Sequence, residues 1–96
     1  MSDTDWVFAQ PDPSDELAKL HFFSMKKRQG ESVIEFVITV REYVERNAHY
    51  MRFFAEADKQ TNQKTAPYTP SGWGETLFDA LNECVKAIHR FPYEGI

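Results

Sequence analysis

The stretch from about Gly74 to Phe91 carries the strongest secondary-structure signal in this chain and limits what the rest can fold into. Its apolar residues recur every three or four positions, which predicts a helix with one buried face. They are Leu77, Ala80, Leu81, Cys84, Val85, Ile88 and Phe91. Thr76 with Asp79 resembles a capping box, and Pro92 ends the helix. A single helix covers only one face of a sheet, so any strands here must leave a second face to be explained.

Residues 33–44 predict a strand. Alternation places four large apolar residues on one side of it, namely Ile34, Phe36, Ile38 and Val40. The valines of this stretch also fit a helical spacing. Seven of the twelve residues are β-branched, however, and their stiff side chains favour a strand.

Two further stretches complete the expected sheet. Residues 50–58 predict a strand that pairs with residues 33–44 across a turn at 45–49. Residues 14–27 are ambiguous and predict a short helix or turn that leads into another strand, followed by a turn through Gly30. The expected fold is therefore α+β, with an antiparallel sheet of about three strands packed on the C-terminal helix. With a short N-terminal helix, the order becomes αβββα.

Length and charge indicate one domain with an acidic arm. A chain of 96 residues fits a single domain, which we place at 14–96, after an arm at 1–13. In the arm, Trp6 and Phe8 are expected to anchor to the body. The net charge of −4 is concentrated at this end, because residues 1–16 hold five acidic residues and no Lys or Arg. The N-terminus lacks the pattern of a signal peptide, and no stretch is apolar enough to span a bilayer. We therefore expect a cytoplasmic protein without a membrane partner.

Residues 58–72 predict a long polar loop that runs into the helix start. Loops of this length are either functional or mobile. Gly72 and Gly74 flank Trp73, and a helix start with free N–H groups is able to hold an anion. Glu75 opposes that use, so we interpret the glycines as allowing tight backbone geometry while Trp73 folds over the helix start or the sheet. The alternative is contact with a peptide or small ligand by Tyr68 and Trp73.

The sequence shows no catalytic or metal-binding constellation. The three histidines are far apart, and neither HxxxH nor CxxC spacing occurs. The single cysteine, Cys84, lies in the apolar stripe of the helix, which predicts a buried structural thiol. We therefore assign no catalytic residue, metal or cofactor, and expect the chain not to be an enzyme.

The sheet face turned away from the helix is the main candidate surface. Val33, Val37, Arg41 and Tyr43 are expected on it, together with Arg52 and Phe54 from the next strand. This face is too apolar to be left in water without a reason. Three coverings are considered: the N-terminal segment with Trp6, Phe8, Phe22 or Phe23, a second copy in a homodimer, or single-stranded nucleic acid stacked on the aromatic rings with Arg41 and Arg52 on phosphates.

Two resemblances touch parts of the chain. The stretch GETLFDALNECVKAI, residues 74–88, is similar to the strand-to-helix end of HicB-type antitoxins, although the DNA-binding extension of many such proteins is not evident. The αβββα order is similar to that of double-stranded-RNA-binding domains. Their last helix begins with lysines, where this chain has Glu75 and Asp79. Neither resemblance assigns a family.

The residues thus predict a small interaction or regulatory module that self-associates or binds a protein partner. The alternative is a nucleic-acid-binding or antitoxin-like module that uses the outer sheet face. The candidate binding residues are Arg41, Tyr43, Arg52, Phe54, Tyr68 and Trp73.

Overall fold

The computed structural model describes residues 5–45 and 49–94. It contains a four-stranded antiparallel sheet and one C-terminal helix, which confirms the α+β class. Consecutive strands are neighbours, in the order β1-β2-β3-β4. The elements are two 3₁₀ helices, η1 (Asp5–Ala9) and η2 (Pro13–Asp15), then β1 (Ala18–Gln29), β2 (Ser32–Tyr43), β3 (Phe53–Ala57), β4 (Ser71–Gly74) and α1 (Leu77–Arg90).

The fourth strand is the main departure from the sequence expectation. The sequence predicts a loop and a helix start at residues 71–74, but these residues pair with β3, and the helix begins three residues after Gly74. A four-residue segment with two glycines has little strand propensity of its own, so its conformation depends on the pairing with β3. The expected N-terminal helix is replaced by the short η1 and η2.

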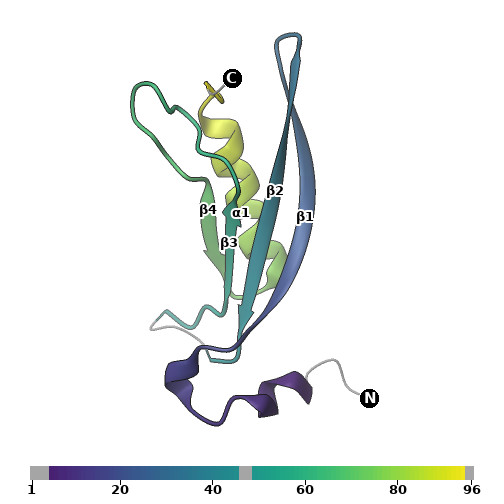
Figure 1. Ribbon diagram of the computed structural model, residues 1–96, viewed down its shortest axis with the longest axis vertical. Coiled ribbons are helices and arrows are strands. Elements are labelled where there is room, and N and C mark those ends of the chain that lie inside the picture. Colours follow the sequence, from purple (N-terminus) through teal and green to yellow (C-terminus); the bar gives the residue numbers. More distant parts are fainter. Residues whose placement is uncertain (1–4, 46–48, 95–96) are drawn as a thin grey trace.

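The long β1–β2 hairpin follows the expected alternation. Its strands pair from Ala18–Tyr43 to Gln29–Ser32, and the two-residue turn has Gly30 in the left-handed region, with a φ of 62°. Figure 1 shows this turn at one end of the molecule and the N-terminal 3₁₀ helices at the other.

The core lies between the sheet and α1, which packs against β4, β3 and β2. The inward face of β2 is buried as predicted, and so are two alanines of β3 and the inner face of α1. The cluster comprises Phe36, Ile38, Val40, Ala55, Ala57, Ala80, Cys84 and Ile88. Thr76 caps α1, since its hydroxyl accepts a hydrogen bond from the backbone N–H of Asp79 at 3.1 Å.

Two glycines let α1 lie directly on β4. A Cβ added to Gly72 would meet the Glu83 Cβ at 2.4 Å, and one added to Gly74 would meet the Ala80 backbone nitrogen at 2.4 Å. Both glycines therefore face the helix, while Trp73 between them points to the opposite face. This confirms that the glycines serve close backbone packing and places Trp73 on the sheet rather than over the helix start.

Replacing Gly72 with alanine should lower the free energy of unfolding by about 1–3 kcal/mol, because the new methyl group forces the helix off the strand. Urea unfolding of Gly72→Ala measures this loss. Ser71→Ala, on the opposite face of the same strand, is the matched control and should change stability by less than about 0.5 kcal/mol. Equal stability of the two variants would contradict this packing.

The far end of β1 is tied to the end of the helix. The Lys27 Nζ donates to the carbonyl oxygens of Ile88 (3.0 Å) and Phe91 (2.9 Å). Two residues further along β1, the Gln29 side-chain amide exchanges two hydrogen bonds with the Tyr93 backbone. Helix C-terminal carbonyls lack partners within the helix, so Lys27 satisfies groups that burial would otherwise leave unpaired.

Lys27→Met is expected to lower the free energy of unfolding by about 1–3 kcal/mol, since charge-assisted hydrogen bonds are among the stronger ones. Thermal or urea unfolding measures the change. The neighbouring Lys26 is exposed on the other face, so Lys26→Met provides the control. If both variants lose the same stability, Lys27 does not cap the helix.

Of the two aromatic residues expected to anchor the N-terminal arm, Trp6 and Phe8, the structure buries neither fully. Phe8 is 85% exposed, whereas Trp6 is half-buried. In Figure 1 the segment with η1 and η2 lies beyond the ends of the strands, where β1 begins and β2 ends, rather than across the broad face of the sheet. Residues 1–4 of the predicted arm and residues 46–48 of the predicted turn lie outside the described residues.

Candidate functional site

The sheet face opposite α1 gathers aromatic residues from three strands. Tyr43 of β2, Phe54 of β3 and Trp73 of β4 form one cluster, which we call the aromatic cluster. The Trp73 ring lies 6.0 Å from that of Tyr43 in a stacked arrangement and 4.8 Å from that of Phe54. Trp73 remains 41% exposed, so the cluster presents one broad aromatic surface to solvent.

Apolar side chains of β1 extend this surface. Leu20 and Phe22 are 49% and 65% exposed. In the strand register Leu20 lies opposite Arg41, which lies opposite Phe54, which in turn lies opposite Trp73. The patch therefore runs across all four strands. Alternation predicts Leu20 and Phe22 on the same side of a strand. The pairing of β1 with β2 then shows that this side is the one turned away from α1.

Charges of both signs lie on the same face. Arg41 is in the middle of the patch, and its guanidinium lies 3.8 Å from the Glu56 carboxylate of the adjacent strand. Farther along the hairpin, Lys26 lies opposite Glu35. The face thus offers a mixed pattern rather than a basic one, which suits a protein surface better than phosphates.

Arg52 is not on this face, contrary to the sequence expectation. Its guanidinium contacts the Glu42 carboxylate at 3.2 Å and lies 5.5 Å from the centre of the Phe53 ring. Glu42 and Phe53 belong by alternation to the helix side of the sheet. His21 contacts the same carboxylate at 2.9 Å, so Glu42 ties together the ends of β1, β2 and β3. The side chain turns away because Arg52 precedes β3, and its Nε donates to the Tyr43 carbonyl.

Tyr68 is separated from the aromatic cluster. Its ring packs edge-on against Phe91 at 5.5 Å, near the end of α1, and its backbone pairs with the buried Thr61. The loop after β3 is further tied to the C-terminal segment by a bond from Asn62 N–H to the Pro92 carbonyl. Tyr68 and Trp73, which the sequence offers together as a candidate ligand contact, therefore pack against different neighbours.

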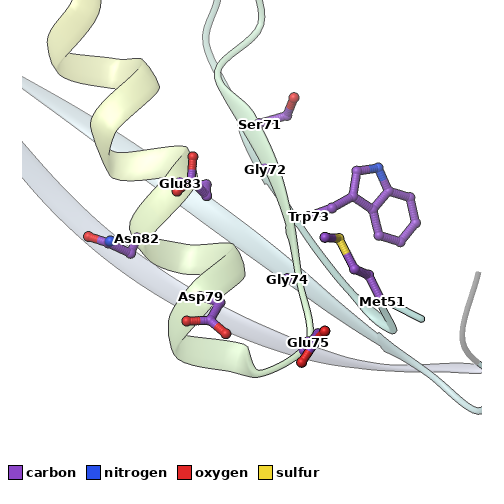
Figure 2. A pocket seen from close by; sticks show the side chains of 9 residues that line it. All are labelled: Met51, Ser71, Gly72, Trp73, Gly74, Glu75, Asp79, Asn82 and Glu83. Atoms are coloured by element: carbon purple, nitrogen blue, oxygen red, sulfur yellow. The ribbon is translucent and has the colours of Figure 1, made fainter. Parts of the chain in front are cut away.

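A groove of about 510 Å³ lies beside β4. Its residues are Met51, Ser71, Gly72, Trp73, Gly74, Glu75, Asp79, Asn82 and Glu83. Figure 2 shows β4 between two walls, with Trp73 and Met51 on one side and Asp79, Asn82 and Glu83 of α1 on the other. The lining includes three carboxylates and no Lys or Arg, so the groove is acidic.

Cys84 is buried in the core, as its place in the helix stripe predicted. Burial, with a smaller contribution from the negative charge of Glu56, raises the pKa of the thiol from 9.0 to about 11. The Sγ lies 3.5 Å from the Pro70 carbonyl oxygen. Partial burial also lowers the pKa of the Lys27 ammonium. Within residues 5–45 and 49–94, no group of three His, Cys, Asp or Glu side chains is arranged to hold a metal ion.

The folded protein should react with a thiol reagent such as DTNB far more slowly at pH 8 than the urea-unfolded chain, because the thiolate is the reactive form. The raised pKa also predicts a pH effect. The stability that the protonated thiol contributes is complete below about pH 9 and is lost as the pH rises through about 11. Fast DTNB labelling of the folded protein at pH 8 would refute the burial of the Cys84 thiol.

Comparison with known proteins gives no relative: no family model, curated protein or solved structure matches this chain. Among the helices that the structure describes, none has the length and apolar character to cross a membrane.

Proposed function

We propose that this protein is a small non-enzymatic interaction module that self-associates through its outer sheet face. The observation that carries the proposal is the aromatic cluster of Tyr43, Phe54 and Trp73, continued by Leu20 and Phe22 on the face that α1 does not cover. Large exposed apolar patches on folded domains mark interaction sites more often than idle surface.

A second copy suits the shape of this face. Two sheets pack face to face at about 10 Å, with side chains interdigitating between them. In a two-fold dimer the same patch of both copies meets at the interface. Each charged residue therefore finds a partner only if the same face also carries a residue of opposite charge. Arg41 with Glu56, and Lys26 with Glu35, supply that mixture.

A nucleic-acid ligand is less well supported by the same face. Stacking proteins pair their aromatic rings with cations that are available to phosphates. Here Arg41 already contacts Glu56, and Arg52 is engaged with Glu42 on the helix side. Both phosphate contacts expected for the nucleic-acid-binding or antitoxin-like alternative are therefore made by guanidinium groups that already have a carboxylate partner.

Phe22→Glu should convert a dimer into a folded monomer, because it places a charge in the apolar interface. Phe22 is 65% exposed, so the substitution leaves the core intact. The matched control is Phe78→Glu: Phe78 is 70% exposed, but it lies on α1. Light scattering after size exclusion measures the mass of each variant, with circular dichroism to confirm folding.

Three results would settle the matter. A wild-type dimer that Phe22→Glu, but not Phe78→Glu, dissociates supports self-association through this face. A wild-type monomer at high concentration refutes it. Absorbance at 260 nm on the same peak, removed by raised salt, would instead favour the nucleic-acid alternative.

A further inference from the structure

The strand β4 is the outer strand of the sheet and has an open backbone edge. It pairs with β3, and no strand of the described chain lies on its other side. The Ala57 N–H donates to the Pro70 carbonyl at 2.9 Å, immediately before β4. Bonded and non-bonded residue pairs alternate along an antiparallel ladder. It follows that Gly72 bonds to β3, while the N–H and C=O groups of Ser71 and Trp73 point to the open edge.

The acidic groove runs along this same edge. On the helix side of β4, the glycines contribute no side chain, and α1 places Asp79 and Glu83 directly beside the strand. On the outer side, Trp73 provides an aromatic wall. The open N–H and C=O groups of Ser71 and Trp73 therefore lie between an acidic wall formed by α1 and an apolar wall formed by Trp73.

We propose that this edge binds an extended basic segment of a partner protein, which joins the sheet as a fifth strand beside β4. Strand addition uses backbone hydrogen bonds for affinity and alternate side chains for specificity. In such a strand, residues beside Gly72 and Gly74 point toward α1, where Lys or Arg meets Asp79 and Glu83. The intervening residues point to the outer face, where an apolar side chain packs on Trp73.

Charge argues against a second copy at this edge. Pairing β4 with the β4 of another copy would bring two acidic helix faces together, which like-charge repulsion disfavours. The edge shares Trp73 with the proposed dimer surface, but the open N–H and C=O groups of β4 and the acidic wall of α1 lie outside that surface. Phe22 lies on β1, at the other side of the sheet. The two proposals therefore fail separately, and Phe22→Glu should keep the edge intact.

The test is a titration of the full chain with a short, acetylated and amidated peptide that alternates valine and lysine. A peptide that alternates valine and glutamate is the matched control. Amide chemical shifts and hydrogen exchange locate the binding. We expect saturable shifts and slowed exchange at the Ser71 and Trp73 amides, and binding of the glutamate peptide weaker by about tenfold or more at low salt.

A charge-reversed chain tests the helix wall. Asp79→Lys with Glu83→Lys should invert the preference toward the glutamate peptide. Glu16→Lys with Glu31→Lys makes the same change of net charge at exposed positions outside the groove and should preserve the original preference. The proposal is overturned if the lysine peptide does not bind, if both peptides bind alike, or if the shifts lie on the outer face without Ser71 and Trp73. The comparison of the two peptides on the wild-type chain needs no variant, so it decides the question even if the reversed chain does not fold.

Discussion

The fold depends on the packing of one helix against one face of a sheet. The helix α1 buries Ala80, Cys84 and Ile88 against the inward residues of β2 and β3. Since the described chain contains one α-helix, its packing also determines which sheet face stays outside. The aromatic cluster lies on that outer face, and the strand order leaves β4 at the edge of the sheet.

Close contact between α1 and β4 explains how one short segment serves both surfaces. Alternation sends Gly72 and Gly74 toward the helix and Trp73 away from it. Because the glycines have no side chains, Glu83 and its neighbours come near the strand backbone and form a charged wall. The same geometry supports Trp73 against Tyr43 and Phe54 on the opposite face.

The paired charges decide which ligands suit these surfaces. Arg41 contacts Glu56 on the outer face, and Arg52 contacts Glu42 on the helix side. Neither guanidinium is positioned as an isolated anion site. The outer face is therefore mixed in charge and apolar in its centre, while the groove beside β4 is acidic. The two surfaces differ in chemistry, and each carries one proposal: self-association on the outer face, and addition of a basic strand at the groove.

The sequence by itself determined the elements whose signals are local. The stripe of α1, its cap at Thr76 and the alternation of β2 follow from side-chain spacing and residue type, which act over a few positions. The aromatic residues Tyr43 and Phe54 were placed on the outer face for the same reason.

Only the tertiary structure decided the features that depend on long-range pairing. The segment Ser71–Gly74 becomes a strand because β3 provides the hydrogen bonds that its own composition does not favour. Arg52 turns to Glu42, and Tyr68 packs on Phe91, because partners distant in sequence lie within reach. The spacing of residues along the chain does not predict these contacts. The groove beside β4 likewise forms only when α1 packs on Gly72 and Gly74. The sequence alone therefore does not predict that these residues line one site.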